Sequence, residues 1–457
     1  MRSFMGKNFL LSNKWSRDLY HNYASKLPII DYFCRIPAKD IAKNVSYSNI
    51  TELWFSSDNY KCRAMRSAGV EEKYILGNAS AYEKFREYCR IMPSLMGNGA
   101  YILSHLELIC YFDCHLTINE KNCDEIWKLT AERLCAEDMR AKSIIQKSNC
   151  ALICTADDPA DSLDFHKQIK EDSSFSTIVL PTFCPDAGLN VSKVGFRAYV
   201  ESLGRANGVE IEDLKSLVSA YELSIGRFDS HGCKIAFHSL GEYSRFVKPN
   251  EYQADMIFKK ALASDGRDLT NEEIMLFKGE MLYLLGKLYK SRGWAIRLCL
   301  PGDEGSKNAR VDHREFESLI DYLVSNEAMP KTVIEPAVFT DSVAVSFITD
   351  SLRKANSIAP VVINAGVWGL NDDVSAVGRN FADISNMEAI GRQIGVFTDS
   401  EIIVSFSVHE YFRRILCDKL SSWALDEGYP IDFEDLAQIV CDICYNNAKK
   451  FFGFQLN

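Results

Sequence analysis

Short apolar runs recur along the whole chain with helical stretches between them, and this alternation limits the fold more than any other feature. Eight runs can be identified, at residues 29–34, 150–155, 177–180, 235–238, 295–299, 332–336, 361–364 and 394–399. They are continuously apolar and lack strict polar–apolar alternation, which is typical of strands buried on both faces of a parallel sheet. Eight strand–helix units predict an α/β fold, a (β/α)8 TIM-type barrel.

The helical stretches differ in how clearly they are marked. The clearest runs from Thr270 to Arg292, where Thr270 and Glu273 form a capping-box pattern and Gly293 follows the last turn. Residues 40–147 separate the first two strands and are too long for a simple crossover. They predict a helical insertion after strand one, packed over one end of the barrel, with helices near 81–92, 102–111 and 123–135.

The part after Asp399 is also predicted to be helical, at residues 409–427 and 433–452. The chain contains no internal repeat, low-complexity segment or Pro- or Ser-rich linker. We therefore expect residues 1–457 to form a single barrel unit that contains the 40–147 insertion and a helical C-terminal part.

Composition excludes some classes of partner. The formal net charge of −10 argues against nucleic acid and against anionic membrane surfaces. No apolar run approaches the roughly 18 residues that a membrane span needs, and residues 1–7 lack the apolar core of a signal peptide. Fifteen cysteines without a secretion signal fit a reducing compartment, so we predict a cytoplasmic protein.

Several stretches spread over the whole chain point to a known family. They are 9–11, 19–21, 58–66 (Asp-Asn-Tyr-Lys-Cys-Arg-Ala-Met-Arg), 155–163, 231–234, 292–294, 397–400, 446–448 and the longest, 409–417 (His-Glu-Tyr-Phe-Arg-Arg-Ile-Leu-Cys). In these residues the chain resembles the uronate isomerases, a divergent branch of the amidohydrolase superfamily. The resemblance implies a (β/α)8 barrel, interconversion of D-glucuronate with D-fructuronate and of D-galacturonate with D-tagaturonate, and a divalent metal such as zinc.

The chemistry of such an isomerase sets what its site must contain. Moving a proton between C1 and C2 requires a base and an electrophile that holds the developing oxyanion, and a metal ion can be that electrophile. The carboxylate of the uronate favours an arginine fork. The resemblance implies that a His-x-His pair of the first strand and an Asp at the end of the last strand hold the metal.

The sequence departs from that pattern at most of these positions. Phe33 and Arg35 stand at the two histidine positions, Asn59 at that of a pocket histidine, Cys184 and Glu401 at those of arginines, and Cys299 at that of a histidine in the fifth strand. Asp399, Tyr60 and Lys61 are retained. Asp399 and Tyr60 are therefore the candidate catalytic residues. The candidate substrate pocket consists of Phe33, Arg35, Asn59, Lys61, Cys184, Cys299 and Glu401.

Each candidate also has a purely structural interpretation. Asp399 is either part of a residual site or a cap of the following helix. Tyr60 and Lys61 either line the pocket or brace the helical insertion. Cys184 and Cys299 either fill space at the pocket or offer thiols to a soft metal. Glu401 would repel an anionic sugar, so uronates are expected to bind weakly.

These departures favour a catalytically degenerate, uronate isomerase-like protein with no cofactor and no metal. Its expected partners are a small sugar-acid-like ligand and either a second copy of the chain or an active relative. The alternative is an active uronate isomerase, or another carbohydrate isomerase, with a rearranged metal site.

A structural prediction follows for the positions of the lost ligands. Alternate side chains of a barrel strand face the same way, so Phe33 and Arg35 should both face the interior. Asp399 ends the eighth run, which neighbours the first strand when a barrel closes. We therefore predict an Arg35–Asp399 ion pair with Phe33 filling the adjacent volume.

Overall fold

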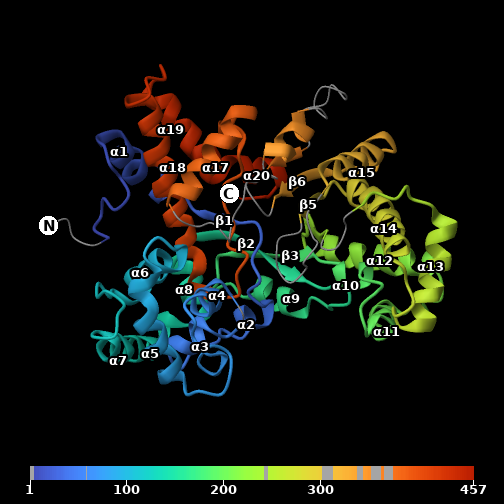
Figure 1. Ribbon diagram of the computed structural model, residues 1–457, viewed down its shortest axis with the longest axis horizontal. Coiled ribbons are helices and arrows are strands. Elements are labelled where there is room, and N and C mark those ends of the chain that lie inside the picture. Colours follow the sequence, from blue (N-terminus) through green and yellow to red (C-terminus); the bar gives the residue numbers. More distant parts are fainter. Residues whose placement is uncertain are drawn as a thin grey trace.

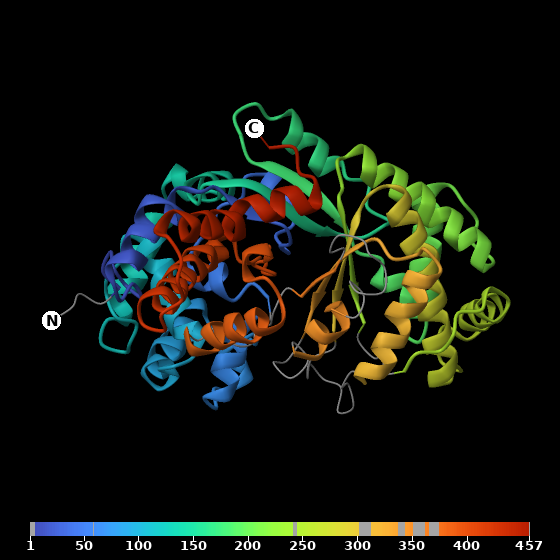
Figure 2. The same ribbon diagram turned by 90° about the horizontal axis from the view of Figure 1, so that it is seen from above.

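A curled parallel sheet forms the centre of the molecule (Figures 1 and 2). The computed structural model describes residues 5–57, 59–240, 245–300, 312–336, 343–350, 362–364 and 374–456. Within them the seven strands follow the chain order β1 to β7, each paired in parallel with the next. They are β1 Ile29–Asp31, β2 Cys150–Asp157, β3 Ile178–Phe183, β4 Ile235–Ser239, β5 Ala295–Cys299, β6 Lys331–Glu335 and β7 Val362–Asn364. The predicted α/β barrel-type fold is confirmed; Val361, the predicted start of the seventh strand, lies outside the described residues.

The prediction of an eighth strand at 394–399 was wrong, although this segment does lie beside β1. The backbone N–H of Asp399 bonds the carbonyl oxygen of Phe33 at 3.2 Å. The N–H and hydroxyl of Thr398 instead bond the Asp31 carboxylate, at 3.1 and 2.6 Å. Asp399 itself has a φ of +44°. A side-chain carboxylate thus replaces ladder partners, and a left-handed residue ends the extended run.

Helices fill the long connection between β1 and β2. They are α2 Ala38–Ala42, α3 Ile50–Trp54, α4 Tyr60–Ser67, α5 Ala81–Ile91, α6 Gly99–Phe112, α7 Cys123–Leu134 and α8 Ala141–Lys147. The prediction of a helical insertion therefore agrees with the structure, and α5, α6 and α7 lie at the three expected places. Their buried side chains form a core with Trp54 and Phe85 that continues onto Ile153 of β2, so these helices pack against the sheet.

A second set of helices follows β2 to β7 along the chain, and most of them cover the outside of β3 to β6. It comprises α9 Asp164–Glu171, α10 Asp186–Leu189, α11 Phe196–Asn207, α12 Leu214–Ser230, α13 Glu251–Ser264, α14 Asn271–Ser291, α15 His313–Ser325 and α17 Val374–Met387. The predicted capping box of α14 is confirmed, because Thr270 and Glu273 each accept from the backbone of the other. Figure 2 shows α11 to α15 on the opposite side of the sheet from the insertion.

The two ends of the chain pack together beside the insertion. The N-terminal helix α1, Lys14–Asn22, lies against α18, Ser407–Leu425, in a shared apolar cluster with Leu19 and Leu416 (Figure 1). The chain ends in α19, Phe433–Cys441, a π-helical turn at Asp442–Asn446 and α20, Asn447–Phe452. The helical C-terminal part is thus as predicted.

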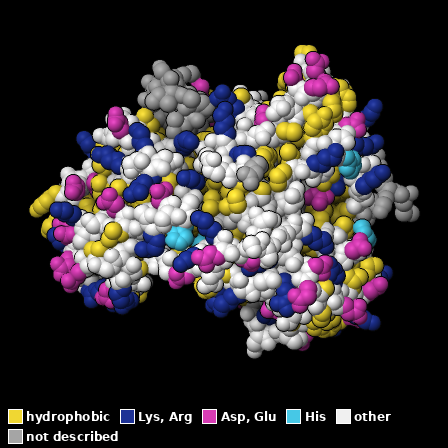
Figure 3. Space-filling view, turned by 180° about the vertical axis from the view of Figure 1, so that it is seen from behind, with side chains coloured by type: hydrophobic (Ala, Val, Ile, Leu, Met, Phe, Trp, Pro, Cys, Tyr) yellow, Lys and Arg dark blue, Asp and Glu magenta, His cyan; other side chains and the backbone are white. Residues whose placement is uncertain are grey.

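The helices and the surface were compared with what a membrane or a strongly charged partner would require. Among the described residues, no helix has the length and apolar character needed to cross a membrane. On the face shown in Figure 3, acidic and basic side chains are interspersed over most of the surface.

Candidate functional site

The interior of the barrel is apolar at its centre and charged toward the carboxyl ends of the strands. Along β5, Ala295, Arg297 and Cys299 alternate onto the inner face, while Ile296 and Leu298 face the helices. Glu335 is the last residue of β6 and is paired in register with Cys299. A charged layer therefore forms at the end of the barrel where active sites of this fold lie.

Arg297 is the central cation of this layer. Its side chain is 1% exposed and its guanidinium binds the Glu335 carboxylate. The guanidinium carbon lies 4.2, 4.8 and 4.1 Å from the ring centres of Phe33, Phe237 and Phe397. The three phenyl rings thus exclude water from the cation while their faces attract it.

Charge pairing compensates the burial of Arg297. Burial opposes its charge, but the attraction of Glu335 and Asp399 outweighs this and raises the pKa of Arg297. Burial is also the largest influence on Glu335, whose pKa is raised in spite of the guanidinium. The site therefore depends on the Arg297–Glu335 pair to keep either charge in the barrel.

The predicted Arg35–Asp399 pair is confirmed. Arg35 Nε donates to Asp399 Oδ1 at 2.6 Å, and Asp399 Oδ2 lies 3.7 Å from Arg297 Nη2. The Arg35 guanidinium also lies over Phe33, which is fully buried, at 5.5 Å from its ring centre. Asp399 precedes the 3-10 turn Ile403–Phe406 and does not cap it, so its interpretation as a helix cap was wrong.

The pair is not deeply buried. The Arg35 and Asp399 side chains are 44% and 35% exposed. We therefore expect Arg35→Met to lower the free energy of unfolding by about 1 kcal/mol or less, since Asp399 keeps Arg297 as a neighbour and half-exposed pairs contribute little. Urea unfolding of Arg35→Met beside Asp399→Asn measures this. A loss of about 3 kcal/mol or more from Arg35→Met would show that the pair acts as a buried one.

The two pocket cysteines lie at the same end of the barrel. Cys184 directly follows β3 and Cys299 ends β5, and both are half-buried. Burial raises the pKa of each thiol, and Arg35 is among the charged groups near both. Both are therefore protonated at neutral pH, and their thiols contact backbone carbonyl oxygens of Thr182 and Leu300.

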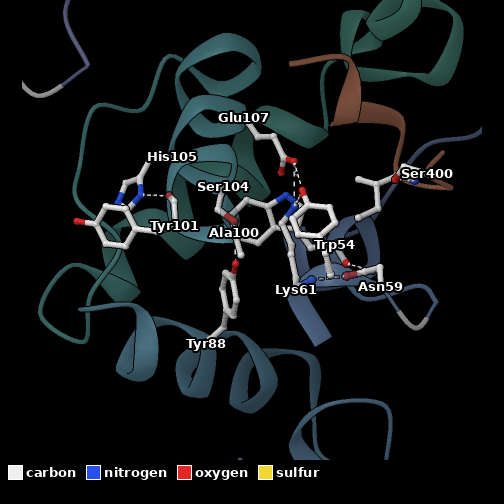
Figure 4. Close-up of polar contacts among 12 residues, drawn as sticks. Trp54, Asn59, Lys61, Tyr88, Ala100, Tyr101, Ser104, His105, Glu107 and Ser400 are labelled. Atoms are coloured by element: carbon white, nitrogen blue, oxygen red, sulfur yellow. Dashed lines mark hydrogen bonds and ion pairs between the residues drawn. The ribbon is translucent and has the colours of Figure 1, made fainter. Parts of the chain in front are cut away.

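Three further candidate residues, Asn59, Tyr60 and Lys61, lie at the start of α4 in the helical insertion (Figure 4). Lys61 Nζ binds Glu107 Oε1 at 2.9 Å, and both side chains are 0% exposed. The Tyr60 hydroxyl donates to the same oxygen at 2.9 Å. Asn59 caps α4 by accepting from the backbone N–H of Lys61 at 2.9 Å. The structure brings these three residues to one another and to Glu107, which also lies in the insertion.

Comparison with known proteins identifies the family. A family model described as glucuronate isomerase matches residues 1–452. A uronate isomerase of Lachnoclostridium phytofermentans is 36% identical over 99% of this chain and 100% of that protein. One of Endomicrobium trichonymphae is 36% identical over 100% of both chains. The chain belongs to the uronate isomerase family.

Solved structures agree with this assignment. The uronate isomerase of Thermotoga maritima superimposes with a TM-score of 0.88 at 28% identity, over 98% of this chain and 99% of the other. The glucuronate isomerase of Caulobacter crescentus gives 0.87 at 18% identity, over 99% and 98%, and supports the fold. Members of the uronate isomerase family thus share the barrel and the helices around it.

Within the described residues, no group of three or more His, Cys, Asp or Glu side chains is arranged to hold a metal ion. At the three positions where the resemblance implies ligands, Phe33 has no donor atom, Arg35 is a cation, and Asp399 is paired with Arg35. These side chains do not fit a divalent cation.

Glu401 is exposed and lies two residues after Asp399 in the sequence. Water screens its charge, so the repulsion of uronates that we argued from the sequence loses most of its strength. The weak binding of uronates is left without a structural reason.

Arg297 and Glu335 are the site residues that sequence reasoning missed. Each is a charged residue inside an otherwise apolar run, and Arg297 lies two residues before Cys299, on the same face of its strand. Charged residues in two neighbouring buried strands are expected to pair. That signal was present in the sequence.

Proposed function

We propose that this chain is a catalytically degenerate, non-metal-binding member of the uronate isomerase family that keeps a ligand site at the carboxyl end of its barrel. The observation that carries the proposal is the pairing of Asp399. Its carboxylate is bonded to Arg35 and lies beside Arg297, so two guanidinium groups occupy the space around it.

Electrostatics argue against a metal at this place. A divalent cation bound to Asp399 would have to displace Arg35 and would still face Arg297, which is 1% exposed and cannot lose its proton. Two cations a few ångströms apart repel each other by several kcal/mol in a partly buried site. An isomerase of this family would then lack its electrophile.

The remaining candidates do not supply the missing chemistry. Lys61 and Tyr60 are committed to Glu107 inside the insertion. The thiols of Cys184 and Cys299 are protonated because burial raises the pKa of both. The base and the electrophile that isomerisation requires are therefore not assembled around Asp399.

The alternative is an active uronate isomerase, or another carbohydrate isomerase, with a rearranged metal site, and the observation that favours an active site is Asp186. Asp186 begins α10, two residues after Cys184, and burial raises the pKa of its carboxyl group to about 6. A carboxylate with a pKa near neutral is suited to act as a general base. Where no metal is bound, Arg35 would have to stabilise the developing oxyanion.

A metal analysis with an isomerase assay separates the two functions. Purified protein is expected to carry well under one zinc per chain and to convert neither D-glucuronate nor D-galacturonate, because Phe33 and Arg35 cannot act as ligands. Stoichiometric zinc, or turnover with added metal, would contradict the proposal. Turnover without metal that is lost in Asp186→Asn would establish the alternative.

A double variant provides a matched control. Phe33→His combined with Arg35→His restores the implied ligand pair and frees Asp399 from Arg35, so it is expected to bind clearly more zinc than the wild type, although Arg297 stays 3.7 Å from Asp399 and weakens the site. The same preparation then shows that the metal analysis detects zinc in this barrel.

A further inference from the structure

Arg35 offers unused hydrogen-bond donors at the mouth of the barrel. A guanidinium has five N–H donors, and to the described residues the Arg35 side chain makes one hydrogen bond, from Nε to Asp399. Its side chain is 44% exposed. The edge formed by its two Nη groups is therefore available to a molecule that enters from solvent.

The orientation of this guanidinium is fixed by its surroundings. It lies 5.5 and 5.9 Å from the ring centres of Phe33 and Phe237. The backbone N–H of Arg35 donates to the Ser400 carbonyl oxygen at 3.1 Å. An arginine held by a carboxylate on one side and by two aromatic rings beneath loses little entropy when it binds a second planar anion.

Asp399 does not depend on Arg35 alone. Its second oxygen lies 3.7 Å from Arg297 Nη2, so it keeps a neighbouring cation if Arg35 turns partly toward a ligand. The charges of Arg35, Arg297, Glu335 and Asp399 sum to zero, and Arg35 is much more exposed than Arg297, at 44% against 1%. Asp399 is itself 35% exposed, so an entering anion meets both charges, and its attraction comes from the two Nη groups of Arg35, which make no hydrogen bond to the described residues.

The geometry points to Arg35 as a carboxylate anchor that binds the carboxylate of a sugar acid through its two Nη groups, at the place where the resemblance implies a metal cation. The inference rests on the proposed function and names its ligand. The position at which the resemblance implies a metal cation would then bind an anion instead. The sugar acid would then lie with its carboxylate on the two Nη groups of Arg35, away from the like-charged Asp399, and with its hydroxyl groups toward the mouth.

Calorimetric titration of the full chain tests this. D-Glucuronate and D-galacturonate are the probes, and D-glucose is the matched sugar without a carboxylate. The uronates are expected to bind about tenfold more tightly than D-glucose, or better, because a bidentate charge-assisted pair forms with them alone. Arg35→Gln is expected to remove that preference, and Arg35→Lys to keep only part of it.

The control is Arg267→Gln, which removes one positive charge from an exposed side chain elsewhere on the surface. It should leave uronate affinity within about twofold. Melting curves of the variants establish that each is folded, and Arg35→Lys replaces Arg35→Gln if the latter is not.

The outcomes separate the anchor from the proposed function. Unchanged uronate affinity in Arg35→Gln, equal affinity for D-glucose, or no binding of either uronate up to about 10 mM would each overturn the anchor. Isomerase turnover in the same samples would overturn the proposed function, and the affinities would still decide the anchor.

Discussion

Arg297→Met is expected to lower the free energy of unfolding by about 3–5 kcal/mol, because it leaves a carboxylate buried without its partner. Glu335 is 9% exposed and is bonded to Arg297, and burial already raises its pKa. Without the guanidinium, Glu335 must either stay charged in an apolar barrel or take up a proton. Either course costs free energy in the folded state alone. Urea unfolding followed by circular dichroism measures the loss.

The control is the double variant Arg297→Met with Glu335→Leu. It removes both charges and replaces them by apolar side chains of similar length. It should recover most of the stability lost in Arg297→Met, since buried pairs are often no more stabilising than apolar packing. A double variant as unstable as the single one would show that Arg297 acts through its three aromatic contacts instead of through its charge.

The sequence was informative about the fold because strands and helices are marked by local patterns. Continuous apolar runs located β1 to β7, and the capping box of α14 was visible as Thr270 and Glu273. The eighth run failed because its partner is a side chain. The Asp31 carboxylate accepts a hydrogen bond from the backbone N–H of Thr398, and the positive φ of Asp399 ends the extended segment. Neither is visible in the hydrophobicity of 394–399.

The candidate site was predictable only where neighbouring strands were known. Arg35 and Asp399 were paired correctly, because closure of a barrel brings the first and last strands together. How far solvent reaches that pair is not visible in the sequence, and the structure leaves the two side chains 44% and 35% exposed. Arg297 and Glu335 are visible in the sequence as charged residues inside apolar runs, but pairing them also required the register of β5 and β6, in which Cys299 lies opposite Glu335.

Lys61→Met is expected to lower the free energy of unfolding by about 3–5 kcal/mol as well, although it lies outside the barrel. Lys61 and Glu107 are both 0% exposed, and the Tyr60 hydroxyl shares the same carboxylate oxygen. The Lys61 ammonium also lies 5.2 Å from the ring centre of Trp54. Removing the lysine leaves Glu107 in an apolar core with one hydroxyl donor. The double variant Lys61→Met with Glu107→Gln keeps an acceptor for Tyr60 and should recover most of the loss.

The pH dependence of this difference gives an independent check. Burial lowers the pKa of Lys61 from 10.5 and raises the pKa of Glu107 from 4.5. Just below pH 10.5 the unfolded chain holds more protons on the lysine, so stability rises with pH there. Just above pH 4.5 the folded chain holds more protons on the glutamate, so stability rises as pH falls there. The stability of the wild type relative to the double variant should therefore be lowest between these windows and rise toward both. A difference that is flat from pH 5 to pH 10 would show that neither group is desolvated as the structure requires.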